Sequence, residues 1–313
     1  MKKLFNSKLK GNKFKIFIII SILMFSLVGC GMVENKTSEN KISENTEPVT
    51  QYNSAFSKIE SDYGVKLGVY AFDTGTNKEV TYNADNRFAY CSTFKSLISG
   101  AVLQKYPLDQ LKQVIKYTQN DILSYAPVTK NHVDKGMTIE ELCDAAIRFS
   151  DNTAGNLLFN LIGGPSGFKS ALNQLGDTVT EPARIEPELN NATPGDNRDT
   201  STPRQLAIDL KEYTTGNILT DDKKKILIDW MSGNATGDKL IRAGAPKDWI
   251  VSDKSGAGSY GTRNDIAIVM PPNKKPIFVA ILSSKNEKDA KYDDEVISKA
   301  SKIVFDYLIK TKK

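Results

Sequence analysis

The fold is decided in the stretch Ala89-Tyr90-Cys91-Ser92-Thr93-Phe94-Lys95-Ser96-Leu97-Ile98-Ser99-Gly100-Ala101-Val102, where an extended segment gives way to a helix. Apolar residues recur there at i, i+3, i+4, i+7 and i+8, the pattern of one buried helical face, at positions 94, 97, 98, 101 and 102. Ser92 is therefore predicted at a helix N-terminus, where backbone N–H groups favour a developing negative charge. Lys95 lies one turn further along the same face.

Ser92 and Lys95 form an S-x-x-K motif. A desolvated lysine beside a serine can take its proton, so the two side chains can act as nucleophile and base without a histidine. The same pattern recurs at Ser7, Ser38 and Ser166, but only Ser92 opens an apolar helix directly after an extended segment. The alternative is a helix-capping serine beside a solvated lysine.

Ser150-Asp151-Asn152 lies between two predicted helices. It is either an ordinary turn, since all three residue types cap and turn, or a second hydroxyl that passes a proton to a departing amide nitrogen. In the second interpretation Asn152 hydrogen-bonds a substrate amide.

Lys254-Ser255-Gly256 is predicted to end a strand that begins near Trp249. The small residues beside the lysine would let a peptide-like ligand lie along the strand edge, and a surface hairpin is the alternative. Arg263 follows, and with Ser255 it can bind a substrate carboxylate, unless it is a solvated arginine.

The chain has predicted strands at both ends and helices between them. Strands are expected at 65–73, 78–83, 249–252, 265–270 and 277–283, and helices around 56–59 and at 94–102, 138–149, 153–162, 166–175, 203–213, 221–231 and 293–309. Thr138 and Glu141 form a capping box for one of these helices. This order implies a sheet assembled from distant parts of the chain, with helices packed on it.

The first 29 residues predict a lipoprotein signal peptide. They hold six lysines and no acid, followed by an apolar run from Ile16 to Val28 that is too short for a stable membrane anchor. Leu27-Val28-Gly29-Cys30 resembles a lipobox, with Cys30 as the lipidated residue, and a plain secretory signal with a chance cysteine is the alternative. Residues 30–50 then form a polar, flexible tether, and residues 51–313 form the catalytic domain.

This leader decides how charge and location are interpreted. The chain carries a net charge of +5, and subtracting the six leader lysines leaves about −1, so no basic face for nucleic acid is expected. The predicted location is outside the cytoplasm, anchored to the membrane by the N-terminal lipid, with a possible shed soluble form.

Cysteine and histidine are scarce. Cys91 and Cys143 can pair in a compartment that permits disulfides, or stay as two free buried thiols, which the absence of any CxxC motif favours. His132 is the single histidine, and it is expected on the surface. A histidine-rich metal site is therefore excluded.

The three motifs in this order resemble those of class A β-lactamases and penicillin-binding proteins. Arg184-Ile185-Glu186-Pro187-Glu188-Leu189-Asn190, with Pro194-Gly195-Asp196 and Arg198-Asp199-Thr200 after it, resembles the Ω-loop of the class A enzymes. The resemblance covers the chain from about Asn53. It implies an α+β fold of two parts: a five-stranded antiparallel sheet formed by both chain ends with helices on its faces, and an all-helical subdomain.

The resemblance also implies a reaction, the hydrolysis of penicillins and cephalosporins through a serine acyl-enzyme. Ser92 would be the nucleophile, with its own N–H and that of Ala257 binding the oxyanion, and Ser150 would protonate the ring nitrogen. Glu186 would activate the water that Asn190 helps to hold. Whether Lys95 or Glu186 is the base for acylation stays open.

Other residues receive supporting roles from the same resemblance. Tyr125, Asn152, Lys254, Ser255, Gly256 and Arg263 would bind substrate, and Arg184 and Asp199 would tie the neck of the loop, in which Glu186-Pro187 is expected to be cis. Members with a disulfide at the Cys91 or Cys143 position pair it with positions that here hold Gly258 and Ser99, so no internal disulfide is expected. No cofactor is implied, the partner is a small β-lactam, and the protein is expected to be a monomer.

Two competing functions share the serine and lysine. A penicillin-binding DD-peptidase lacks the Glu186 loop, and a β-lactam sensor acylates without turnover. Both predict a stable covalent adduct, whereas a cell-wall-binding lipoprotein with an inactive site predicts none.

Overall fold

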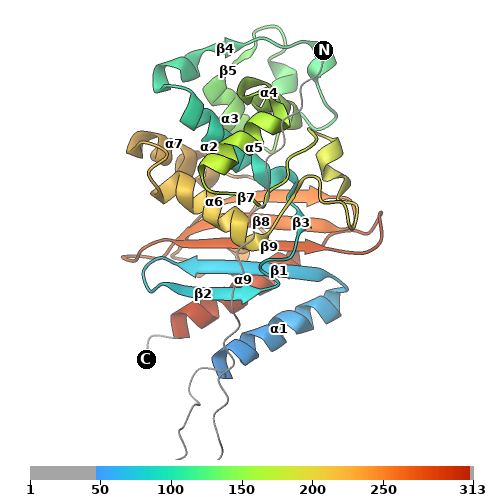
Figure 1. Ribbon diagram of the computed structural model, residues 1–313, viewed down its shortest axis with the longest axis vertical. Helices are drawn as coiled ribbons and strands as arrows, with labels where there is room; N and C mark the ends of the chain where they lie inside the picture. The colour runs from blue at the N-terminus through green and yellow to red at the C-terminus, as the bar shows by residue number, and fades with distance from the viewer. Residues whose placement is uncertain (1–46, 311–313) are drawn as a thin grey trace, which may run out of the picture. The chain divides into compact units, whose positions relative to one another are not determined.

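The structure, a computed structural model, describes residues 47–310 of the 313-residue chain. Its centre is a five-stranded antiparallel sheet in the order β2-β1-β9-β8-β7 (Figure 1). The strands are β1 (Lys66–Asp73), β2 (Lys78–Tyr82), β7 (Ile250–Gly258), β8 (Thr262–Met270) and β9 (Ile277–Ser284). The first and last strands of the chain are neighbours, with Lys66 opposite Ser284. The prediction of a sheet formed by both chain ends is confirmed.

Two terminal helices cover one face of this sheet, α1 (Glu47–Tyr63) and α9 (Asp294–Lys310) (Figure 1). Leu67, Val69 and Ala71 alternate along β1 and pack with Phe56 of α1 and Phe305 of α9 in one buried cluster. Because successive strand residues point to opposite faces, Tyr70 belongs instead to the core on the other side.

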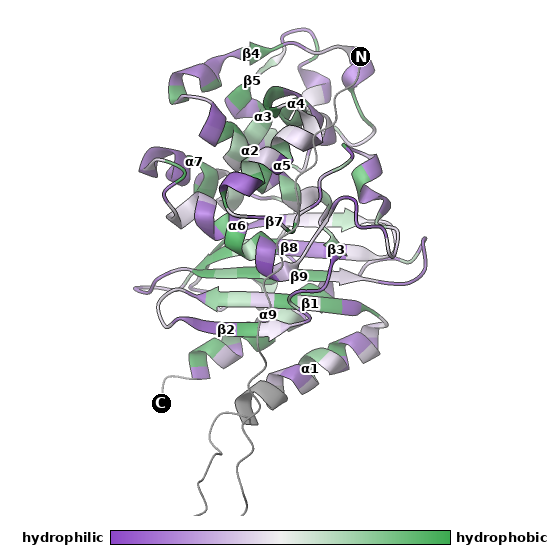
Figure 2. Cartoon of the chain, in the orientation of Figure 1, coloured by the Kyte–Doolittle hydropathy of each residue, from purple (hydrophilic) through white to green (hydrophobic). Residues whose placement is uncertain are grey.

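The helical middle of the chain forms the second part. It contains α2 (Phe94–Lys105), α3 (Ile139–Arg148), α4 (Asn152–Ile162), α5 (Gly164–Gln174), α6 (Pro203–Thr215) and α7 (Asp221–Ser232). Helix α6 packs against β1, β8 and β9. Figure 2 shows hydrophobic residues along β1 and β9 and on the helices around α2, whereas the outer loops are hydrophilic.

Helix α2 departs from the prediction of a single buried face. It contacts each of the helices α3 to α7, and all of its residues from Phe94 to Leu103 are buried. The polar residues on the other faces are buried with partners: Ser96 Oγ donates to Thr93 O and Ser99 Oγ to Lys95 O. The nucleophile therefore begins the central helix of the molecule.

Strands β7 and β8 are longer than predicted. Lys254-Ser255-Gly256 lies inside β7 and does not end it, and Arg263 lies in β8. The prediction failed because both strands carry buried polar residues, among them Asp253, Asn264 and Asp265, that interrupt the apolar pattern. Lys254 and Arg263 therefore lie in the paired part of strands β7 and β8, where the backbone is fixed by hydrogen bonds between the strands.

Several short elements were not predicted, because two to five residues carry no periodicity. They are β3 (Phe88–Ala89) paired with β6 (Thr200–Ser201), β4 (Val114–Ile115) paired with β5 (Met137–Thr138), α8 (Ile241–Gly244), and the 3-10 turns η1 (Cys91–Thr93), η2 (Leu108–Lys112), η3 (Gln119–Asp121), η4 (Thr129–Asn131) and η5 (Glu188–Asn191).

Some boundaries also shift. Helix α1 begins at Glu47, inside the predicted tether, with Pro48 in its first turn, where proline is tolerated. The predicted signal peptide and Cys30 lie outside the described residues. Among residues 47–310, none of the helices has the length and apolarity needed to span a membrane.

Candidate active site

Ser92 lies in the 3-10 turn η1, directly before α2. The turn is held by the carbonyl of Tyr90, which accepts hydrogen bonds from Thr93 Oγ1 (2.7 Å) and from Asn264 Nδ2 of β8 (3.1 Å). Cys91 takes a left-handed conformation, with φ 47°, a region that non-glycine residues adopt at a cost. The hydroxyl is thus presented by a constrained turn at the beginning of the central helix.

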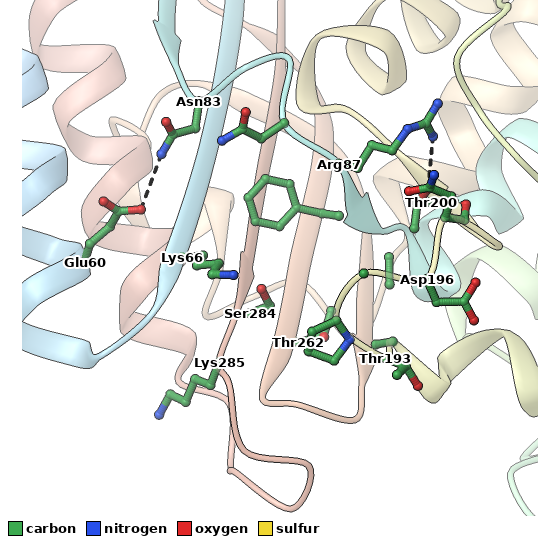
Figure 3. A pocket seen from close by; sticks show the side chains of 17 residues that line it. Glu60, Lys66, Asn83, Arg87, Thr193, Asp196, Thr200, Thr262, Ser284 and Lys285 are labelled. Carbon is green, nitrogen blue, oxygen red and sulfur yellow. Dashed lines mark hydrogen bonds between the residues drawn. The ribbon is translucent and has the colours of Figure 1, made fainter.

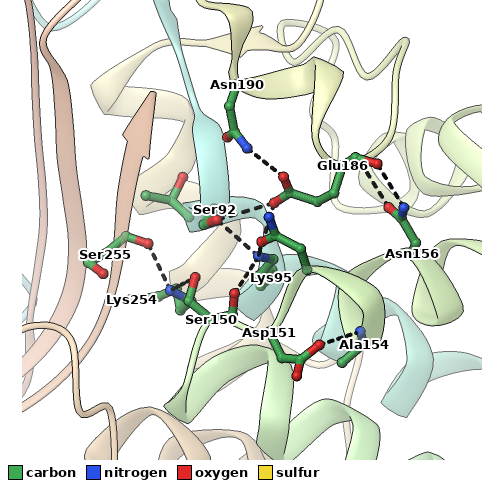
Figure 4. Close-up of polar contacts among 12 residues, drawn as sticks. Ser92, Lys95, Ser150, Asp151, Ala154, Asn156, Glu186, Asn190, Lys254 and Ser255 are labelled. Atoms are coloured by element: carbon green, nitrogen blue, oxygen red, sulfur yellow. Dashed lines mark hydrogen bonds and ion pairs between the residues drawn. The ribbon is translucent and has the colours of Figure 1, made fainter. Parts of the chain in front are cut away.

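Lys95 is fully buried beneath Ser92 (Figure 4). Its Nζ donates to Ser92 Oγ (3.0 Å), Ser150 O (2.9 Å) and Asn152 Oδ1 (2.6 Å), and lies 3.0 Å from Glu186 Oε1. Burial lowers the pKa of this amine, and the carboxylate of Glu186 opposes that shift. The group therefore sits between a hydroxyl and a carboxylate, in reach of both.

Ser150 and Lys254 form the opposite wall of the site. Ser150 has φ 56° at the end of α3, and its Oγ lies 3.2 Å from Lys254 Nζ, which also donates to Ser255 O (2.8 Å). Burial, and after it the charge of Lys95, lower the pKa of Lys254 to about 7. Lys254 can thus exchange a proton near neutral pH.

Asp151 has a structural role within the second motif. Its carboxylate caps α4 through Ala154 N (2.9 Å) and accepts from Val128 N (3.0 Å) and Thr129 N (2.9 Å). These bonds anchor the loop that contains Tyr125, Val128 and Thr129. The carbonyl oxygen of Tyr125 in turn accepts from Asn152 N (3.0 Å). The motif is therefore a turn, and this turn brings Ser150 and Asn152 to Lys95.

Glu186 reaches the same point from the loop. Its Oε1 accepts from Ser92 Oγ (3.3 Å), and its Oε2 accepts from Asn190 Nδ2 (2.5 Å) (Figure 4). Asn156 of α4, which sequence reasoning missed, clamps the backbone of Glu186: its Nδ2 donates to Glu186 O (2.8 Å) and its Oδ1 accepts from Glu186 N (2.9 Å). An asparagine in a helix gives no signal of such a role in sequence.

The neck of the loop is tied at Asp199. This buried carboxylate accepts from Arg184 Nε (2.5 Å), Arg184 N (2.9 Å), Ala183 N (2.8 Å) and Tyr90 OH (3.1 Å). The last bond joins the loop to the nucleophile turn. The Glu186-Pro187 bond is cis, as expected.

A cleft of about 350 Å³ opens above these groups. All the predicted substrate-contacting residues except Lys254 line it, and Lys254 lies below it through its contact with Ser150. The lining residues are Ser92, Tyr125, Ser150, Asn152, Asn190, Thr236, Ser255, Gly256, Ala257, Arg263 and Tyr292. Tyr125 is half exposed at the rim. The cleft has the size of a small-molecule site.

Arg263 is held in place by two residues that sequence reasoning missed. Its Nε donates to Asp294 Oδ1 (2.7 Å), and its guanidinium lies 4.7 Å from the ring centroid of Tyr292. Thr236 Oγ1 lies 2.6 Å from Ser255 Oγ. Each contact joins residues far apart in sequence, so no local pattern indicates it.

Gly256 and Gly258 let β7 pass close to the nucleophile turn and the loop. A Cβ on Gly256 would lie 3.0 Å from Tyr90 O, and one on Gly258 would lie 2.7 Å from both Cys91 Sγ and Asn190 O. This proximity places the backbone of Ala257 beside Ser92. Cys91 and Cys143 are both buried free thiols, and His132 is exposed.

Comparison with known proteins identifies the family to which this chain belongs. The profile of the family described as "Beta-lactamase enzyme family" matches residues 51–308. A β-lactamase of Bacillus amyloliquefaciens is 52% identical over 296 residues, covering 94% of this chain and 97% of that protein. "Beta-lactamase 3" of Bacillus cereus is 50% identical, with 96% of each chain covered.

Solved structures agree. The crystal structure of a class A β-lactamase from Clostridium kluyveri has a TM-score of 0.82 and 74% identity, and it covers 83% of this chain and 99% of that one. A halotolerant bacterial β-lactamase has a TM-score of 0.80 and 49% identity, with 82% and 98% covered. The chain therefore belongs to the class A β-lactamases, serine hydrolases that open the β-lactam ring and so confer antibiotic resistance.

Proposed function

We propose that Ser92 Oγ attacks the lactam carbonyl carbon and that the N–H groups of Ser92 and Ala257 stabilise the oxyanion. The attack forms the Ser92 ester and breaks the lactam C–N bond. Two preorganised backbone donors in a water-excluded site are worth several kcal/mol to such a transition state. The close passage of β7 over the nucleophile turn at Gly256 supports this arrangement.

Two groups can receive the Ser92 proton, Lys95 Nζ at 3.0 Å and Glu186 Oε1 at 3.3 Å. Ser150 then donates a proton to the departing ring nitrogen and is recharged through Lys254, which lies 3.2 Å from its hydroxyl. The rate of acylation in a Glu186→Ala variant separates the two acceptors, because fast acylation there requires Lys95 as the base.

The observation that carries the assignment of turnover is the position of Glu186 Oε1, 3.3 Å from the ester-forming oxygen. From there the carboxylate can take a proton from a water that attacks the ester, and Asn190 orients the carboxylate and the water. This step separates a hydrolase from a DD-peptidase or a sensor that stays acylated. Continuous colour release from a chromogenic cephalosporin is expected, whereas a stoichiometric burst would contradict turnover and no colour would contradict acylation.

We propose that Ser255 and Arg263 bind the carboxylate of the substrate and that Asn152 binds the amide of its side chain. Tyr125 would form a wall of the cleft. Arg263 keeps its terminal nitrogens available because Asp294 is bound through Nε. Penicillins and cephalosporins both carry the required carboxylate and amide. Arg263→Ala is expected to raise KM more than it lowers kcat, and an unchanged KM would exclude this contact.

The location is proposed from the sequence alone. Cys30 would carry a diacylglyceryl group and hold a monomeric enzyme on the outer side of the bacterial membrane, with the residues between Cys30 and helix α1 as a tether and a shed soluble form released by cleavage within it. Cys30→Ala should abolish incorporation of labelled palmitate. Continued labelling of that variant would refute the lipoprotein assignment.

A further inference from the structure

A series of hydrogen bonds links the buried carboxylate of Asp253 to the active-site cleft. Asn234 Nδ2 donates to Asp253 Oδ2 (2.5 Å), and Asn234 Oδ1 accepts from Thr236 Oγ1 (2.7 Å). Thr236 Oγ1 in turn lies 2.6 Å from Ser255 Oγ. Thr236 and Ser255 both line the cleft, so the series ends at the hydroxyl to which we assign the substrate carboxylate.

The orientation of the Asn234 amide is fixed from both sides. The backbone N–H of Thr236 donates to Asn234 Oδ1 (3.0 Å), and it could not donate to the amide nitrogen, which is not an acceptor. On the other side, Asp253 accepts from Nδ2 and is itself held by Arg242. A Cβ on Gly237 would lie 1.7 Å from Asp253 Oδ2, so this glycine lets the turn pack on the carboxylate. The oxygen of Asn234 therefore faces Thr236.

This orientation decides the direction of the two hydroxyl bonds that follow. An amide oxygen carries no proton, so Thr236 Oγ1 uses its single proton to donate to Asn234 Oδ1. Thr236 can then only accept in its contact with Ser255, and Ser255 Oγ supplies the proton of that bond. In the substrate-free protein, Ser255 therefore directs its proton to Thr236 and has only lone pairs left for the cleft.

A substrate carboxylate needs the opposite arrangement. An ionised carboxylate only accepts hydrogen bonds, so Ser255 can bind it only after the hydroxyl proton has turned away from Thr236. That turn leaves Thr236 Oγ1 without its donor. The loss of one neutral hydrogen bond corresponds to a factor of about two to ten in affinity. Arg263 does not share this penalty, because Asp294 occupies its Nε and not its terminal nitrogens.

We propose that Thr236 is a positioning residue that competes with the substrate carboxylate for the proton of Ser255. This inference rests on the carboxylate contact proposed for Ser255. The competing bond exists only in the substrate-free protein, whereas Ser255 binds the carboxylate in both the substrate complex and the transition state. Removing the Thr236 hydroxyl should therefore raise kcat/KM and leave kcat unchanged.

The test is steady-state hydrolysis of benzylpenicillin by the purified full-length protein. Thr236→Val removes the hydroxyl but keeps the shape of the side chain, and kcat/KM should rise about two- to tenfold. Thr236→Ala should change kcat/KM in the same direction. Thr236→Ser restores the hydroxyl and should return kcat/KM to the parental value. A residue that only supported the structure would lower kcat/KM when replaced, so the direction of the change separates the two roles.

Two further variants establish whether the effect passes through Ser255. Ser255→Ala removes the contested proton and should lower kcat/KM, and adding Thr236→Val to it should have no further effect. Thr193→Val is the matched control, because Thr193 lines a separate cleft of about 360 Å³ that shares no lining residue with the active-site cleft (Figure 3). This control should keep the parental kcat and KM.

Three results would overturn the proposal. The first is a kcat/KM that rises in neither Thr236→Val nor Thr236→Ala. The second is a rise that persists when Ser255 is alanine, which would show that Thr236 acts through another group. The third is a parental kcat/KM in Ser255→Ala, which would also remove the proposed carboxylate contact. A loss in Ser255→Ala without a gain in Thr236→Val would overturn the competition alone and leave that contact in place.

Discussion

Replacing Glu186 with glutamine tests the proposed mechanism most directly. Glutamine keeps the volume and one acceptor oxygen for Asn190 and Ser92, but it loses the negative charge that lies 3.0 Å from Lys95 Nζ. At that separation the gross Coulomb attraction is about 5 to 6 kcal/mol for an effective dielectric constant near 20, offset in part by the cost of burying both charges. Removing the anion lowers the pKa of Lys95 further, which leaves more neutral amine beside Ser92.

The two half-reactions should therefore respond differently. Loss of a positioned general base slows deacylation by about 10² to 10⁴-fold. Acylation should slow less, because Lys95 Nζ still lies 3.0 Å from Ser92 Oγ. The acyl-enzyme then accumulates, and benzylpenicillin mixed with the variant and quenched in acid should add one penicillin mass to Ser92.

Two controls frame this experiment. Glu188→Gln changes an exposed acid of the same loop and should turn over like the parent protein, and Ser92→Ala should show no adduct. If Glu186→Gln hydrolyses benzylpenicillin within tenfold of the parent rate, Glu186 is not the base for deacylation. A stable adduct on the unmutated protein would contradict the same reasoning from the other side.

Three further predictions follow from the geometry. Asp199→Asn removes the charge that Arg184 pairs with at 2.5 Å and should lower the free energy of unfolding by about 3 kcal/mol or more; a loss under 1 kcal/mol in urea would contradict this. Because the pKa of Lys254 is about 7, its positive charge is lost as pH rises through that value, so kcat/KM should fall on this limb; Lys254→Arg should move the limb to higher pH, and an unmoved limb would remove Lys254 as its source. Thiol titration of the unfolded, unreduced catalytic domain should find both Cys91 and Cys143, and fewer than two thiols would reveal a disulfide.

Local signals predicted most of the secondary structure. The capping box at Thr138 and Glu141 is present in the structure, and helix α9 lies within one residue of its predicted bounds. The buried strands were less predictable. Asp253, Asn264 and Asp265 are polar residues in the sheet core. They form hydrogen bonds with Arg242, Ala89 O and Ile241 N, respectively, and no local pattern reveals these partners.

The active site likewise contains residues that the sequence predicted and residues that it did not. Motif order and resemblance indicated Ser92, Lys95, Ser150, Glu186 and Lys254, and the structure brings all five together. Spacing alone did not establish this, since the S-x-x-K pattern occurs elsewhere in the chain. Sequence reasoning missed the residues that orient Glu186, Ser255 and Arg263, which are Asn156, Thr236, Tyr292 and Asp294.

By itself the sequence determined the family, the helix that Ser92 opens and the loop that carries Glu186, because these features are encoded in contiguous residues. Only the tertiary structure decided how close Glu186 comes to Ser92 and which neighbours bury Lys95. The physical reason is that distances and burial arise between segments that lie far apart in the sequence, and they are set when the sheet and the helical part pack together.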